Sequence, residues 1–315
     1  MKAALASCLA TGPVWGLLRR RALRDNPLTV LCYHTLGPDT GGINGWTVLR
    51  ESDFLAQLAD LRRHYDIVSL DDALSCENPG RPLAVITFDD GDVGLTTHLA
   101  PILSETGGVP VTIYVATAQF ETRTPFWFDR VVNALQGPGD VDLDGLGRWT
   151  LPGGGGRAHW TVLGSILEAL KNCPADRRDA LADQVTAQGK PVSGLGPMTI
   201  EQLRSLAAMP GVTIGAHSHG HELLDQLPLE TARQSIARSR DLLRDWTGQA
   251  VRHFAFPNGN HTAELRETVR ELGFASATIL EDRTAPRGSD PFALPRVSIG
   301  RYDSQDRFRL RLVGI

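Results

Sequence analysis

The chain has 315 residues, of which 42% are hydrophobic and 22% charged, enough for a sizeable core in one large domain or two small ones. Its formal net charge of −4 provides no basic field over the whole molecule, which argues against a nucleic-acid-binding protein. The four cysteines include no CxxC pair, a usage that suits a reducing compartment.

The first predicted element is the segment of residues 1–27, which joins an uncharged stretch to a basic one. Residues 3–18 carry no charge, as in a short signal peptide or anchor, but Gly12 and Pro13 interrupt them and the stretch is too short to span a bilayer comfortably. The basic run LLRRRALR (17–24) overlaps its end. We therefore predict an amphipathic segment that packs on the protein or lies on a membrane surface, with a cleaved signal peptide as the alternative.

From residue 28 onward, short apolar runs alternate with amphipathic helical patterns. The predicted strands are 28–33, 83–88, 109–115, 211–216, 251–256 and 274–279. The predicted helices are 52–65, 94–105, 199–209, 229–248 and 262–273. Strands that are apolar throughout and alternate with helices predict a parallel sheet covered by helices, and six or more such units favour closure into a barrel.

One region interrupts this alternation. Residues 137–158 are rich in glycine and predict either a flexible loop or a hairpin, and a helical stretch follows over 162–185. We predict that residues 120–197 are an insertion into a single domain of residues 28–315.

The residues that directly follow four of the predicted strands include side chains that can bind a metal. They are His34; Asp89 and Asp90; His217, Ser218, His219 and His221; and Pro257 and Asn258. Because the carboxyl ends of parallel strands meet at one face, these groups are expected to converge. Two imidazoles and one carboxylate can bind a divalent metal and leave positions open for water and substrate, which favours hydrolysis.

Each motif taken alone has a simpler interpretation. The Asp-Asp-Gly and Pro-Asn-Gly sequences are typical of turns, and a single His34 is typical of a core histidine. Two histidines four residues apart also occur on surface loops, and PFWFDR (125–130) is more typical of the start of a core helix than of a sugar-binding platform. The joint order of the motifs favours the metal site.

The motifs VITFDDG (85–91), HSHGH (217–221) and RHFAFPNG (252–259), in this order, resemble those of the polysaccharide deacetylases with a NodB homology domain, carbohydrate esterase family 4. LCYHT (31–35) is also similar to the opening strand of the branch that deacetylates poly-N-acetylglucosamine and related exopolysaccharides. The resemblance covers roughly residues 28 to 300 and implies a distorted (β/α)7 barrel.

The resemblance also implies roles for individual residues. Asp90, His217 and His221 would bind a divalent metal, zinc in most members, with cobalt or nickel as alternatives. Asp89 would be the general base in removal of acetyl groups from an N-acetylated glycan, and Ser218 would steady the metal-binding loop, with His219 facing away. Pro257 and Asn258 would stand at the substrate side of the site.

Two departures from the family pattern affect these expectations. Ala255 stands where many members have an arginine that orients the catalytic aspartate, and Arg252 cannot be assumed to replace it. The late Leu-x-x-His motif that supplies the protonating histidine is absent, since no histidine follows His261. The run LPRVSIG (294–300) could fill the same strand, and His34 is our candidate for the missing acid.

These gaps leave a second function open, a catalytically weak carbohydrate-binding protein that retains the metal. A 2-His-1-carboxylate iron oxygenase is disfavoured because the carboxylate precedes both histidines and the strands alternate with helices. The absence of a convincing signal peptide favours the cytoplasm or the inner face of the membrane, and the sequence does not indicate the oligomeric state.

Overall fold

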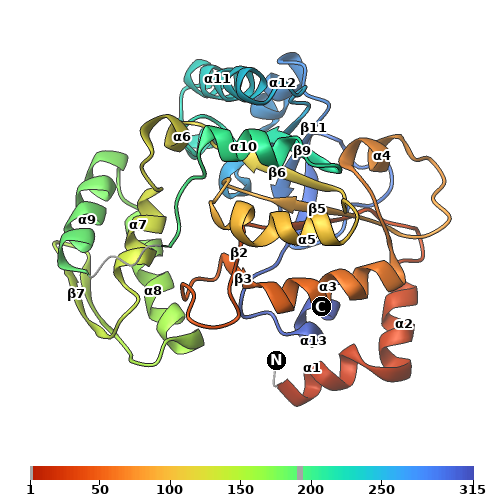
Figure 1. Ribbon diagram of the computed structural model, residues 1–315, viewed down its shortest axis with the longest axis horizontal. Coiled ribbons are helices and arrows are strands. Elements are labelled where there is room, and N and C mark those ends of the chain that lie inside the picture. Colours follow the sequence, from red (N-terminus) through yellow and green to blue (C-terminus); the bar gives the residue numbers. More distant parts are fainter. Residues whose placement is uncertain (1–2, 190–193) are drawn as a thin grey trace.

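Seven parallel strands close into a barrel in the computed structural model, which describes residues 3–189 and 194–315. Around the barrel the strand order is β1, β12, β11, β10, β9, β6 and β5, and β5 pairs again with β1. Their bounds are β1 (Thr29–Tyr33), β5 (Leu83–Phe88), β6 (Val111–Val115), β9 (Val212–Ala216), β10 (His253–Ala255), β11 (Ser276–Leu280) and β12 (Leu294–Ser298). The predicted (β/α)7 barrel is confirmed (Figure 1).

The barrel strands are apolar because both of their faces are covered. In β5 all six residues are buried, and the same holds for the five residues each of β1 and β6. One face of each strand fills the barrel interior and the other packs under the outer helices. Three shorter strands flank the barrel, namely β2 (Thr35–Gly37), β3 (Val48–Arg50) and β4 (Asp66–Ile67).

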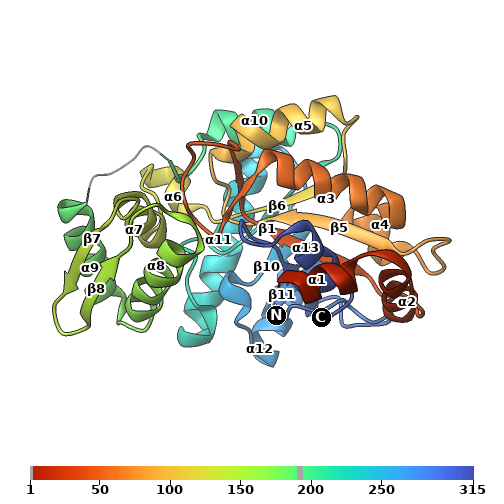
Figure 2. The ribbon, with the colours of Figure 1, turned by 90° about the horizontal axis from the view of Figure 1, so that it is seen from below.

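The outer helices follow the predicted pattern closely, as Figure 2 shows from a second side. They are α3 (Glu51–His64), α4 (Leu70–Ser75), α5 (Ala100–Glu105) after a π-helical turn (Leu95–Leu99), α10 (Ile200–Ala207), α11 (Leu229–Thr247), α12 (Ala263–Glu271) and α13 (Gln305–Leu312). Thr199 and Gln202 form a capping box at the start of α10, and Gly248 ends α11 at a φ of 72°, which glycine adopts without strain. Two short 3-10 turns span Leu224–Gln226 and Pro257–Gly259.

The segment between β6 and α10 forms a separate layer beside the barrel. It contains α6 (Ala118–Thr122), α7 (Trp127–Ala134), β7 (Gly139–Leu143), β8 (Gly147–Leu151), α8 (Gly156–Lys171) and α9 (Ala175–Gln188). The glycine-rich part is an antiparallel hairpin of β7 and β8, one of the two predicted alternatives. The layer has its own apolar cluster, built around Leu163, Ile166 and Val185.

Two helices precede the barrel, α1 (Ala3–Ala10) and α2 (Gly12–Ala22). Ala10 of α1 packs against Leu310 of α13, and Trp15 buries the inner side of α2. Leu23 then joins the main core at the start of the barrel. Among the residues described, none of the helices combines the length and the apolar character that a membrane crossing requires.

All seven barrel strands run in the same direction, so the loops that follow them gather at one end. In Figures 1 and 2 this end faces α6, α7 and the rest of the inserted layer, whereas α2 lies at the far end of the long axis.

Candidate active site

Asp90, His217 and His221 meet at the carboxyl ends of β5 and β9. One possible ligand atom from each lies within 4.8 Å of the other two. The Nε2 atoms of His221 and His217 lie 3.3 Å and 3.6 Å from Oδ1 of Asp90. The loops after two strands therefore bring together the three predicted ligands.

The backbone of these loops is bent into an unusual conformation. Asp90, Ser218 and His221 have φ angles of 73°, 60° and 56°, in the left-handed region that costs a non-glycine residue about 1 kcal/mol. Gly91 follows at 79°, where a Cβ atom would lie 2.9 Å from the ring of Phe120. The fold thus holds the backbone of these loops in a conformation that non-glycine residues disfavour, and this conformation brings the three side chains together.

The other ring nitrogen of His217, Nδ1, is hydrogen-bonded to the protein backbone. Nδ1 donates to the carbonyl oxygen of Ala255 in β10 at 2.7 Å, which leaves the lone pair on Nε2 directed at Asp90. Oδ1 of Asp90 is buried and has no hydrogen-bond partner in the described part of the chain. Two imidazole nitrogens and one carboxylate oxygen are a donor set that suits zinc and similar divalent ions, so the residues fit such a metal.

The protonation of Asp90 and His217 also suits a cation, whereas burial lowers the pKa of His221 but the carboxylate of Asp90 outweighs burial and raises it above its usual range. Burial raises the pKa of Asp90, but the close contact of its Oδ1 with Nε2 of His221, together with the charges of the neighbouring histidines, outweighs burial and holds the pKa below its usual range. Burial lowers the pKa of His217 to about 4. Both groups are therefore deprotonated at neutral pH, as metal ligands must be.

Asp89 points into the barrel and forms a buried ion pair with Arg296 of β12. Two nitrogens of the guanidinium lie 2.6 Å and 2.7 Å from the two carboxylate oxygens, and both side chains are almost fully buried. Burial raises the pKa of Asp89, but the charge of Arg296, aided by His217, holds the pKa well below its usual range. Asp89 is thus a carboxylate kept ionised and oriented beside the three ligand side chains.

Arg296 corrects the expectation that the orienting arginine is missing. Ala255 does stand at the usual position, and Arg252 is exposed and pairs with Asp71, away from the site. The arginine comes instead from LPRVSIG, the run that was expected only to fill the last strand. The one signal in the sequence is a charged residue inside an otherwise apolar strand.

His34 follows β1 and lines a small cavity together with Asp90 and Asp129. Its Nδ1 is buried and without a hydrogen-bond partner among the described residues, and its ring lies edge-on to Trp46 at 5.8 Å. Cys32, two residues earlier, has its sulfur 3.4 Å from Oδ2 of Asp89. Burial raises the pKa of this thiol, so it stays protonated and donates to Asp89.

Asp129 is a buried carboxyl that the sequence reasoning missed. It lies on α7, within PFWFDR, and its side chain has no ion-pair partner in the residues described. Burial, together with the charges of Asp92 and Asp90, raises its pKa well above the usual value. The predicted helix start is correct. The same motif also contributes side chains to the site, because the rings of Phe126 and Phe128 lie 5.0 Å and 5.4 Å from the ring of His221.

Ser218 is buried and connects the histidine loop to α11. Its hydroxyl donates to Glu222 at 2.8 Å, and Glu222 also accepts from the hydroxyl of Ser235 on α11. His219 turns away from the three ligands, with Nδ1 2.8 Å from the hydroxyl of Thr117. Glu222 and Ser235 carry no recognisable motif, and only the folded loop brings them next to Ser218.

Pro257 and Asn258 follow β10 in a short 3-10 turn. Pro257 is buried, but the exposed amide of Asn258 accepts from Lys171 at 2.6 Å and donates to Asn260. The described contacts of Asn258 therefore join it to the inserted layer and not to the three ligands. Its role toward a substrate stays a prediction.

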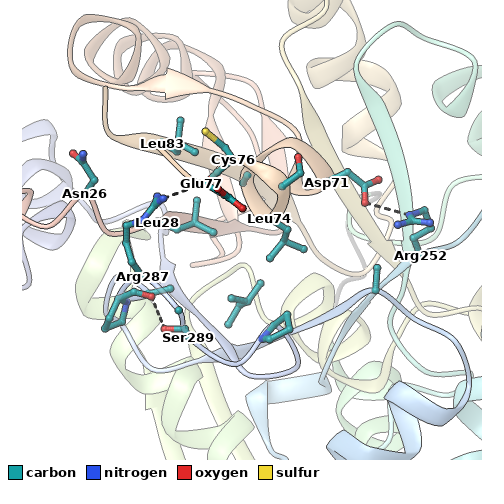
Figure 3. Close-up of a pocket in the computed structure, with 18 residues that line it drawn as sticks. Asn26, Leu28, Asp71, Leu74, Cys76, Glu77, Leu83, Arg252, Arg287 and Ser289 are labelled. Carbon is teal, nitrogen blue, oxygen red and sulfur yellow. Dashed lines mark hydrogen bonds and ion pairs between the residues drawn. The ribbon is translucent and has the colours of Figure 1, made fainter. Parts of the chain in front are cut away.

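A separate cavity of about 580 Å³ lies at the other end of the barrel, near the starts of β5 and β12. In Figure 3 three of its charged groups are held by protein partners: Asp71 pairs with Arg252 at 3.2 Å, and Arg287 donates to the carbonyl oxygen of Cys76 at 3.3 Å. It contains none of the side chains gathered around Asp90. The chemistry described above thus belongs to the carboxyl end of the barrel.

Comparisons with known proteins agree with this arrangement. Residues 157–277 match the family model described as polysaccharide deacetylase, a range that includes His217 and His221 but not Asp89 and Asp90. No curated protein matches the sequence.

Several solved structures have the same fold. A deacetylase from Streptococcus pyogenes, PplD, is 14% identical with a TM-score of 0.60, over 90% of this chain and 97% of its own. IcaB from Ammonifex degensii is 19% identical with a TM-score of 0.58, over 90% and 95%. A de-N-acetylase from Aggregatibacter actinomycetemcomitans is 15% identical with a TM-score of 0.57, over 90% and 99%.

Proposed function

We propose that the chain is a member of the polysaccharide deacetylase family, whose model matches residues 157–277, and that it is a metal-dependent hydrolase that removes N-acetyl groups from N-acetylhexosamine residues of a polysaccharide or glycan precursor. The observation that carries the proposal is an ionised carboxylate, Asp89, fixed by Arg296 directly beside three groups that suit a divalent metal. A base next to an electrophilic ion is the arrangement that hydrolysis of an amide needs.

Asp90, His217 and His221 would hold the metal, which we propose to be zinc, with cobalt or nickel as alternatives. When bound, a divalent ion would lower the pKa of water and polarise the acetyl carbonyl group. The hydrogen bond from His217 to Ala255 fixes the ring, and the network of Ser218 with Glu222 fixes the loop between the two histidines.

Asp89 would act as the general base. Its carboxylate accepts a proton from the attacking water while the oxygen bonds to the acetyl carbon. Arg296 supports this role in two ways, because its two hydrogen bonds fix the carboxylate plane and its charge keeps the group ionised. The thiol of Cys32 donates to the same carboxylate and adds a third fixed contact.

His34 would act as the general acid. When the carbon–nitrogen bond breaks, the leaving nitrogen needs a proton, and the products are acetate and a sugar amine. His34 lies in the cavity beside Asp90, on the side that faces α7. Because no histidine follows His261 in the sequence, the acid has to come from elsewhere in the chain, and His34 is the candidate at the site.

The structural relatives support a glycan as the substrate class only through their shared fold. We propose an exopolysaccharide of the poly-N-acetylglucosamine type because LCYHT (31–35) resembles the opening strand of the branch that deacetylates such polymers. The alternative of a catalytically weak carbohydrate-binding protein drew on a missing arginine. Arg296 removes that part of the argument.

The two adjacent aspartates provide the sharpest test. Asp90→Ala should lose the metal, measured by elemental analysis of the purified protein, whereas Asp89→Asn should keep it and lose acetate release from N-acetylglucosamine oligomers. Equal metal loss in both variants would contradict the assignment. Acetate release by Asp89→Asn at the rate of the unchanged protein would remove Asp89 as the base.

A further inference from the structure

Helix α2 exposes apolar side chains that the rest of the protein leaves uncovered. Leu17 is 70% exposed, more than any other large hydrophobic residue in the described chain, and Val14 is 43% exposed. Trp15 on the opposite side is buried and fixes α2 to the body of the protein. A fixed helix that turns an apolar ridge to the outside has a surface available for a partner.

Basic side chains border this ridge. Arg20, Arg21 and Arg24 are exposed, and none of them forms an ion pair with a described residue. Together with Leu17 and Leu18 they line an open hollow of about 500 Å³. Several other surface arginines, such as Arg252 and Arg233, are paired with carboxylates.

We propose that α2 docks the protein on an anionic lipid surface, with Arg20, Arg21 and Arg24 on the headgroup phosphates and Leu17 in the acyl boundary. Guanidinium groups bind phosphate oxygens in pairs, and a basic helix with an exposed leucine is the type of element that lies in the interface plane. The chain as a whole has a net charge of −4, so the attraction is confined to this helix.

The position of α2 defines the orientation of the docked protein. α2 lies at the end of the molecule opposite the inserted layer, and the loops that carry Asp90 and the two histidines face that layer (Figures 1 and 2). Docking by α2 therefore leaves the mouth of the barrel directed away from the bilayer, open to a glycan in the surrounding solution.

The test is sedimentation of the full chain with vesicles. The protein should pellet with vesicles of phosphatidylcholine and phosphatidylglycerol and stay in solution with phosphatidylcholine alone. Replacing Arg20, Arg21 and Arg24 together by alanine should lower the partition coefficient about 100-fold, or about five-fold for each arginine, and added salt should have a similar effect. The corresponding triple lysine variant keeps the charge and should retain most of the binding.

A matched pair tests the apolar contact. Leu17→Ser should weaken vesicle binding several-fold, whereas Leu229→Ser, at a residue that is 48% exposed on α11, should not change it. Equal binding by the triple alanine variant and the unchanged protein, or equal binding to both kinds of vesicle, would overturn the proposal. Retention on heparin without vesicle sedimentation would assign the helix to a soluble polyanion and also overturn it. Because acetate release is not measured, failure here is distinct from failure of the deacetylase assignment.

Discussion

The ion pair between Arg296 and Asp89 provides the most demanding prediction, because it concerns both stability and turnover. Arg296→Met removes the guanidinium and leaves a carboxylate buried without a counter-charge. Removal of one partner of a buried ion pair typically costs about 3 to 5 kcal/mol. For a chain of this length, that loss corresponds to a fall in Tm of about 5 to 10 °C.

The effect should depend on pH in a defined direction. The folded pKa of Asp89 is depressed, so the pair stabilises the native state above the unfolded pKa of about 3.9, and this contribution is lost as the pH falls through the folded pKa. Without Arg296, burial instead raises the folded pKa, and the variant gains stability as the pH falls. The difference between the two proteins should therefore be largest near pH 7 and smaller at pH 4.

The assay is differential scanning calorimetry of the metal-free proteins, prepared with a chelator, at both pH values. Arg296→Lys is a milder variant that keeps the charge but not the two parallel hydrogen bonds, and Asp89→Asn combined with Arg296→Met should recover much of the loss. Both Arg296 variants should bind the metal as before and release acetate more slowly. A Tm difference below about 1 °C at pH 7, or one that is the same at pH 4, would refute the reasoning.

Two further predictions concern the cavity beside Asp90. His34→Ala should slow cleavage of an N-acetylated sugar by about 100-fold or more. It should slow cleavage of an activated aryl acetate much less, because that leaving group needs little protonation. Equal slowing of both substrates would exclude His34 as the acid. Asp129 has a folded pKa raised by burial, so the native state loses stability as the pH rises above the unfolded pKa. Asp129→Asn should therefore raise the Tm of the metal-free protein by a few °C at pH 8 and have little effect at pH 4, and a lower Tm at pH 8 would contradict this.

The sequence could predict the barrel and the convergence of Asp90, His217 and His221 for the same physical reason. Strands buried on both faces are mostly apolar, so a run of polar residues marks the place where such a strand ends. Asp90 after β5 and His217 after β9 therefore mark strand ends and, in a parallel barrel, a common face. The hairpin of β7 and β8 could be predicted only as one of two alternatives, because glycine-rich sequence permits both.

Arg296 could not be predicted, because its partner is 207 residues away in the sequence. No local pattern indicates which buried charge a distant arginine neutralises, although an arginine in an apolar strand signals that some partner exists. Asn258 shows the opposite difficulty. The turn that carries it was recognisable, but the direction of its side chain, toward Lys171, depends on an inserted layer that the turn itself does not determine.

The position of the Arg296–Asp89 pair in the strand order affects when this ion pair can form during synthesis. β1 lies between β12 and β5, so the pair reaches across the first strand of the barrel to join its last strand to an early one. Asp89, Asp90, His217 and His221 all precede β12 in the sequence, so during synthesis Asp89 lacks its counterion until β12 is made. Under the proposed function, the base is therefore oriented only when the final strand closes the barrel, and a chain clipped before residue 294 would lack the arginine that holds Asp89.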